Sequence, residues 1–220
     1  MIVVIAVVVV AIVVAFVAIA VVSRQRRQDR RARALAGVAP ELGLHYAHGD
    51  ARRQVTRLPL PLVGGGPEPR VSNVLTGSLA SEPLRIFDLT HETPEGVRVI
   101  SQTWSCAVVD IAADFPVTSL RRREQPGGDH PGEPLRTGNY AIDSHFRVRS
   151  EDPDFVTGLL GAGVGKWLAE DPVSVSFELA GRYLACHADS ELPPERIGEL
   201  VRAIAGFRRR IPDGFLRRPP

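Results

Sequence analysis

The stretch that decides how this chain is organised is residues 2–22, IVVIAVVVVAIVVAFVAIAVV. It contains only Val, Ile, Ala and one Phe, with no charged or polar side chain and no Gly or Pro. An α-helix rises about 1.5 Å per residue, so this stretch extends over roughly 30 Å, the thickness of the hydrocarbon core of a bilayer. We therefore expect residues 1–23 to form a transmembrane anchor.

Six arginines follow the apolar stretch and set its expected orientation. They are Arg24, Arg26, Arg27, Arg30, Arg31 and Arg33, offset only by Asp29. A cleaved signal peptide carries its positive charge before an apolar core of about 7–15 residues, whereas here the charge follows a longer core. Arginines next to a membrane span are retained on the cytoplasmic side. We expect an uncleaved, single-pass signal-anchor in the cell membrane, with the soluble domain in the cytoplasm.

The same six arginines have two compatible roles. As an orientation signal they act through their position alone. As lipid contacts, basic side chains near an anionic headgroup layer contribute about 1 kcal/mol each. The sequence therefore indicates the lipid bilayer as one partner, with these arginines as candidate headgroup contacts.

Charge and cysteine content limit the function classes that fit. The formal net charge is +2, and residues 24–33 carry six arginines against one aspartate, so the rest of the chain is slightly acidic. Nucleic-acid binding requires a basic face on the folded part, which argues against that partner. Two cysteines, Cys106 and Cys186, make no disulfide framework in a domain of this size, and we expect free thiols.

Beyond the anchor, the pattern predicts a basic juxtamembrane helix or linker over residues 24–41, a soluble domain over 42–210 and a tail over 211–220. Apolar alternation predicts strands at residues 71–79, 84–89, 97–111, 117–121 and 140–148, and the prolines of residues 58–62 favour an extended edge segment. A hairpin is predicted from residues 173–179 and 182–187, which turn at Ala180-Gly181.

Two helices are predicted within the soluble domain. The first begins at Asp152-Pro153 and runs to about residue 170, although four glycines weaken it. The second follows Pro193-Pro194, with Ile197, Leu200, Val201, Ile204 and Phe207 on its apolar face. The fold class is therefore α+β: a transmembrane helix, then a mainly antiparallel sheet or partly closed barrel with two packed helices.

Several short motifs resemble those of one protein family. They are Leu44-His45-Tyr46 with Asp50, residues 72–77 (SNVLTG), Ile86-Phe87-Asp88, Phe146-Arg147-Val148 and the final Arg-Ile-Pro. Together they are similar to a family of uncharacterised bacterial, actinobacterial-type, single-pass membrane-anchored proteins. The resemblance implies an architecture and assigns no activity, cofactor or site residue.

The catalytic motifs that the sequence suggests all fail on spacing or geometry. Residues 161–166 (GAGVGK) lack the glycine spacing of a phosphate loop, and Trp167 stands where Ser or Thr is needed. His91-Glu92 lacks a second histidine, and His45, His48 and Asp50 lack a third strong metal ligand nearby. On a strand, Ser144 points away from Asp143 and His145, which excludes a triad. We therefore expect no catalytic residue, cofactor site or metal site.

The resulting hypothesis is a non-enzymatic, membrane-tethered cytoplasmic domain that binds a membrane protein, a cytoplasmic protein or lipid. The alternative is a membrane-bound hydrolase or metalloenzyme that uses the region of His45, His48 and Asp50. A weaker option is a homo-oligomer formed through the small residues Ala11 and Ala15.

Overall fold

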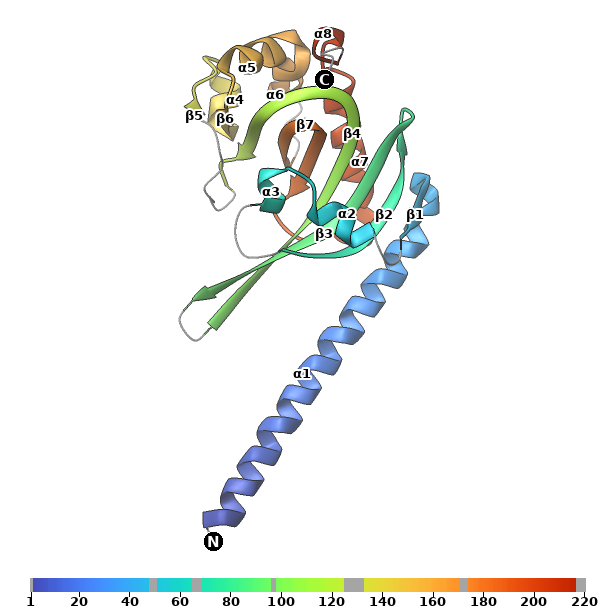
Figure 1. Ribbon diagram of the computed structural model, residues 1–220, viewed down its shortest axis with the longest axis vertical. Coiled ribbons are helices and arrows are strands. Elements are labelled where there is room, and N and C mark those ends of the chain that lie inside the picture. The colour runs from blue at the N-terminus through green and yellow to red at the C-terminus, as the bar shows by residue number, and fades with distance from the viewer. Residues whose placement is uncertain are drawn as a thin grey trace.

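The computed structural model describes residues 2–47, 51–64, 69–95, 98–124, 133–170 and 174–216. Helix α1 (Ile2–Val38) is continuous from the apolar stretch through the arginine run and ends on the domain (Figure 1). Within the described part of the chain, no helix is both long enough and apolar enough to cross a membrane. The predicted anchor includes the side chains of residues 1–11, 13 and 17, which lie outside the described part.

The domain is built on an open, antiparallel sheet of seven strands among the described residues. The strand order is β1-β2-β3-β4-β6-β5, and β7 also pairs with β4. The mainly antiparallel α+β prediction is confirmed, while the partly closed barrel is wrong. The strands are β1 (Leu44–Tyr46), β2 (Arg70–Leu79), β3 (Glu82–Glu95), β4 (Arg98–Arg122), β5 (Glu133–Leu135), β6 (Phe146–Ser150) and β7 (Val175–Ala188).

Strand β4 is the centre of the sheet because it pairs with three other strands. Its first half pairs with β3, and its second half runs between β7 and β6. The separate strand predicted at residues 117–121 is wrong, because β4 continues through two register shifts around Phe115. The predicted hairpin at residues 173–187 is likewise one strand, β7, in which Gly181 adopts a φ of +52°.

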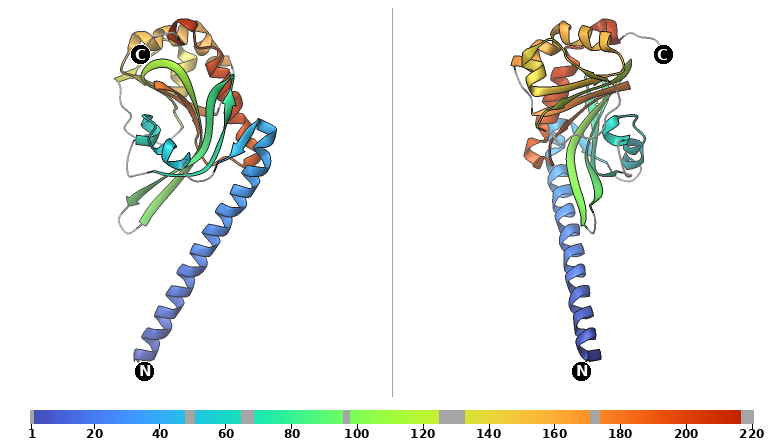
Figure 2. Two further views of the ribbon diagram at one scale, coloured as in Figure 1. Left: turned by 45° about the vertical axis from the view of Figure 1, so that its right-hand side comes forward. Right: turned by 90° about the vertical axis from the view of Figure 1, so that its left-hand side faces the viewer.

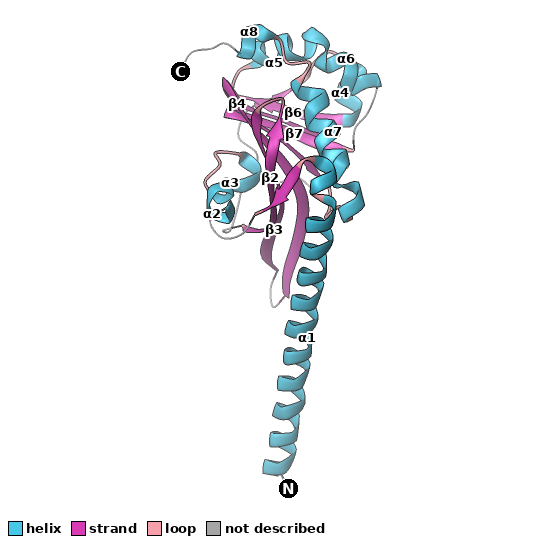
Figure 3. Cartoon of the chain, turned by 90° about the vertical axis from the view of Figure 1, so that its right-hand side faces the viewer, coloured by secondary structure: helices cyan, strands magenta, loops and turns pink. Residues whose placement is uncertain are grey.

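More than two helices pack on the sheet. One face carries the helices α4 (Tyr140–His145), α5 (Pro153–Leu159), α6 (Gly165–Glu170), α7 (Ile197–Arg208) and α8 (Asp213–Leu216), with one π-helical turn (Leu160–Val164) between α5 and α6. The other face is covered by α2 (Ala51–Thr56) and α3 (Pro61–Gly64). Figure 3 shows α2 and α3 on the opposite side of the sheet from α7.

Each face of the sheet has its own core. The larger core contains the apolar face predicted for the last helix: Ile197, Leu200, Ile204 and Phe207 are all buried. Phe207 packs on Phe177 of β7 with ring centroids 4.5 Å apart. The end of α1 belongs to this core as well, because Leu35 is only 1% exposed. The smaller core, under α2 and α3, contains Cys106 among other buried side chains.

Two local predictions fail for identifiable reasons. Residues 140–148 are a strand only from Phe146, because Asn139 caps a helical turn through Oδ1, which accepts from Ala141 N at 3.0 Å. The extended segment at residues 58–62 ends at Pro61, which opens α3. Gly158, one of the four glycines in the first predicted helix, leaves room for the Phe215 ring of α8, which would lie 2.8 Å from a Cβ at that position.

Candidate functional site

The six arginines after the apolar stretch have different environments on α1. Arg26, Arg27 and Arg30 are exposed, and Arg33 donates from Nε to the backbone of its own helix. Arg24 contacts Glu92 of β3, with Nη2 3.2 Å from Oε1. Arg31 differs from the rest because its side chain is only 12% exposed and points into the domain. We therefore remove Arg31 from the candidate headgroup contacts and keep the other five.

Arg31 forms a bidentate ion pair with the buried Asp88 of β3. Its Nε lies 2.7 Å from Oδ2 and its Nη2 lies 2.8 Å from Oδ1, and the Asp88 side chain is 3% exposed. Arg31 also donates from Nη1 to the carbonyl oxygen of Leu192 at 2.7 Å and pairs with Glu191. A single side chain thus ties α1 to the sheet and to the segment that leads into α7.

The remaining acceptor positions of Asp88 are also filled. Asn73 Nδ2 donates to Oδ2 at 2.7 Å, and Ser105 Oγ donates to Oδ1 at 2.9 Å. Asn73 adopts a φ of +52° where the β2 ladder shifts register, and Tyr46 donates its hydroxyl to Asn73 Oδ1. A carboxylate that accepts four such bonds is held in place and has no position left for a substrate. We call this set of Arg31, Asn73, Asp88 and Ser105 the α1 joint.

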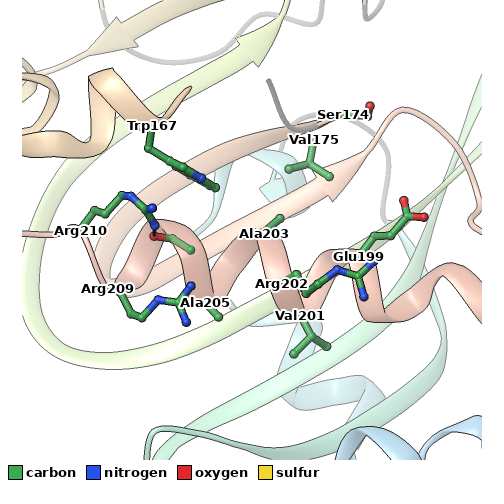
Figure 4. Close-up of a pocket in the computed structure, with 11 residues that line it drawn as sticks. Trp167, Ser174, Val175, Glu199, Val201, Arg202, Ala203, Ala205, Arg209 and Arg210 are labelled. Carbon is green, nitrogen blue, oxygen red and sulfur yellow. Dashed lines mark hydrogen bonds between the residues drawn. The ribbon is translucent and has the colours of Figure 1, made fainter. Parts of the chain in front are cut away.

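A groove of about 610 Å³ lies along α7 and is the strongest candidate for a ligand or partner (Figure 4). Arg210 lies over the Trp167 ring, with its guanidinium carbon 4.9 Å from the ring centroid, and donates from Nη1 to Gly206 O. Figure 4 shows Arg202 on α7 and Arg209 directly after its end, and both side chains are exposed. The groove therefore combines an aromatic ring with exposed positive charge.

The chemistry of this groove favours binding over catalysis. Its carboxylate, Glu199, accepts two hydrogen bonds from Arg196 at 2.8 and 2.9 Å. These bonds hold the pKa of Glu199 below its usual range, so this group is a poor general base. Exposed guanidinium groups beside an aromatic ring suit an anionic or planar group on a ligand or partner protein.

A second depression, of about 820 Å³, lies at the β5–β6 edge of the sheet. It is lined by Arg123, Arg136, Arg147 and Arg149 and by Tyr140, whose side chain is 87% exposed. Exposed tyrosine and arginine are the residue types enriched in protein interfaces. The elements that line the two depressions, α7 and the β5–β6 edge, lie on the domain and away from the apolar half of α1 (Figure 1).

The catalytic candidates of the sequence are not brought together. His45 lies on β1, while His48 and Asp50 lie outside the described residues. His91 makes a hydrogen bond with Leu62 O at 3.1 Å. Asp143 and Ser144 lie on α4, where the Asp143 carboxylate accepts from Thr137 and the Ser144 hydroxyl donates to a backbone carbonyl. Across the part of the chain that the structure describes, no group of three metal-ligating side chains occurs.

Both cysteines are fully buried free thiols. Burial raises the pKa of Cys106, and it raises that of Cys186 as well. Neither thiol has the lowered pKa that a nucleophilic cysteine needs. They pack as small apolar side chains on opposite faces of the sheet.

Sequence reasoning missed both the α1 joint and the groove. Asn73 and Asp88 stand in the motifs that resemble the membrane-anchored family, but nothing in those motifs gives them a role. Only the fold brings Arg31, Asp88 and Ser105 together, because 57 and 74 residues separate Arg31 from its two partners. For the groove, the signal available in the sequence was the basic run 208–210 after an amphipathic helix.

Comparisons with known proteins establish the fold and no activity. No protein-family model matches the chain, and no curated protein matches its sequence. Among solved structures, the crystal structure of the mycobacterial trehalose monomycolate transport factor A, TtfA, is similar to this chain with a TM-score of 0.58. The sequences are 14% identical, and the similarity covers 82% of this chain and 96% of TtfA. At this identity the similarity shows a shared fold and assigns the chain to no family.

Proposed function

We propose that this protein is a single-pass, membrane-tethered cytoplasmic domain that binds protein or lipid in a lipid-transport process. The observation that carries the proposal is helix α1. Its side chains from Ile12 to Val22 include six large apolar ones that are 49–70% exposed, yet the same helix continues into the domain core at Leu35. Exposed apolar surface of this extent suits lipid as its surroundings.

Two further observations support this role. The arginines that remain exposed on α1 follow directly after the apolar stretch, where anionic headgroups would lie. TtfA, whose fold this chain shares, is by its name a trehalose monomycolate transport factor. The exposed arginines of the two basic depressions suit a partner protein or an anionic lipid headgroup.

The tethering is tested on the full chain expressed in cells. We expect it in the membrane fraction after alkaline carbonate washing, with the domain protected from protease in sealed right-side-out vesicles or spheroplasts. Recovery of intact protein in the soluble fraction would contradict the tether. Cleavage of the domain in those preparations would contradict its cytoplasmic orientation.

The binding role is tested by proximity labelling from the C-terminus in living cells. We expect the charge reversal Arg209→Glu, in the groove, to deplete a defined set of labelled membrane or lipid-transport proteins. Arg57→Glu is the matched control, because Arg57 is exposed on the opposite face of the sheet. Equal labelling by wild type and both variants would exclude the groove as the binding surface.

A further inference from the structure

The hairpin formed by β3 and β4 carries exposed apolar side chains at its outer end. Val99 is 63% exposed and Ile100 is 50% exposed, whereas Val108 and Val109 of the same strand are fully buried. Adjacent residues of a strand point to opposite faces. Neither face of the hairpin is therefore covered by the domain at this level.

This hairpin extends in the same direction as the apolar half of α1. Figures 1, 2 and 3 show it leaving the domain on the side toward the N-terminal part of the helix. Arg24 is the first charged residue after the apolar stretch of α1. Because it contacts Glu92, Glu92 on the hairpin lies at the same level as the end of that apolar stretch. Three more residue pairs follow Glu92 and end in Glu95–Arg98. At about 3.3 Å per residue the hairpin continues for about 10 Å past that contact.

The charges at this level suit a headgroup layer. Glu92 lies near two arginines, because Arg70 Nη1 is 3.6 Å from the same Oε1 that Arg24 contacts. The Glu92 carboxylate is therefore balanced by two basic side chains, which reduces its repulsion from anionic lipid. Beyond Glu92 lie the exposed Val99 and Ile100.

The height of the hairpin relative to α1 is fixed by packing. The α1 joint clamps the helix to β3 through Arg31 and Asp88, and Leu35 and Ala39 are each 1% exposed in the core. Strand β3 forms one arm of the hairpin and also contains Asp88. A single strand thus links the helix contact to the exposed end.

We propose that the end of the β3–β4 hairpin inserts into the surface of the bilayer that α1 spans, with Val99 and Ile100 in the interfacial region. The inference rests on the proposed tethering of α1 and adds a second membrane contact to it. The occupant is lipid because the exposed Val99 and Ile100 lie at the level of the apolar surface of α1, beyond the contacts of Arg24 and Arg70 with Glu92. Two contacts at a fixed distance hold the domain in one orientation relative to the membrane.

The test measures the depth of a fluorescent label in the full chain. Ile100→Cys is labelled with the fluorophore NBD, and Tyr140→Cys is the control because Tyr140 is 87% exposed on α4. The native thiols are buried and do not compete for the label in the folded protein. The proteins are reconstituted into vesicles of phosphatidylcholine and phosphatidylglycerol that contain spin-labelled lipid as a quencher.

We expect several-fold stronger quenching and a blue-shifted emission for the label at position 100 relative to position 140. In Val99→Glu/Ile100→Cys we expect the quenching at position 100 to decrease toward that of the control. Equal, water-like emission at both positions in protein that floats with the vesicles would overturn the hairpin insertion and leave the tether intact. Failure of the wild-type chain to float would overturn the tether and the insertion together.

Discussion

Removal of the Arg31 side chain is the sharpest test of how the helix is fixed to the domain. In Arg31→Ala the Asp88 carboxylate keeps its bonds from Asn73 and Ser105 but loses both guanidinium bonds, at 2.7 and 2.8 Å. The substitution leaves a buried carboxylate without its cation, since the Asp88 side chain is only 3% exposed. It also removes the donor to Leu192 O.

The expected cost follows from this burial. Breaking a buried ion pair by removing one partner destabilises a protein by about 3–5 kcal/mol. Asp88→Ala leaves the Arg31 guanidinium unpaired from the other side, so it should also be costly. Because both changes remove the same contact, the double variant should cost less than the sum of the two, by about 0.5–3 kcal/mol.

The measurement is urea unfolding of the full chain in mild detergent, followed by tryptophan fluorescence. Arg30→Ala is the matched control, because Arg30 precedes Arg31 on the same helix and is exposed. We expect the free energy of unfolding of this control to stay within about 0.5 kcal/mol of wild type. If Arg31→Ala were no more destabilised than Arg30→Ala, the α1 joint would not hold the helix to the domain.

Three further predictions concern side chains and glycines inside the fold. Burial raises the pKa of the Glu178 carboxyl from 4.5 to about 7, so the folded state holds the proton more tightly than the unfolded state. Relative to Glu178→Gln, the free energy of unfolding should therefore fall as pH rises from 4.5 to 7, by on the order of 3 kcal/mol, and a pH series of urea unfolding checks this. A rise over that range would contradict it. Gly206→Ala should lower the unfolding free energy by about 1–3 kcal/mol, because its Cβ would lie 2.8 Å from the Trp167 ring. Gly161→Ala, with nothing within 4 Å of the new Cβ, should instead raise it by about 0.4–1 kcal/mol in the same assay, and a loss at Gly161 would refute the contrast.

The elements that sequence reasoning places well are those whose apolar period is long and unbroken. Helix α7 has buried side chains at every predicted position except Val201, and α1 runs through the arginine run to Val38. In both cases local pattern and tertiary packing favour the same structure.

The errors occur where tertiary pairing overrides a local signal. Ala180-Gly181 has the composition of a turn, yet β7 continues through it because β4 supplies hydrogen-bond partners on both sides of Gly181. The polar and apolar residues of 140–148 alternate as in a strand, but only the part from Phe146 onward is one. The first part forms the helical turn α4, because Asn139 caps it. The Asp88 network could not be predicted at all, since its members meet only after the sheet has formed.

The continuous connection between α1 and the domain fixes the orientation of the domain's surfaces relative to the helix. Leu35, near the end of the continuous helix α1, and Ala39, which directly follows the helix, are both buried in the domain core. Among the described residues, no flexible hinge therefore separates α1 from the domain. A rotation of α1 about its long axis must therefore rotate the groove along α7 and the β5–β6 edge through the same angle. The direction from which a partner can reach these two surfaces is therefore set by the rotation of α1 about its own axis.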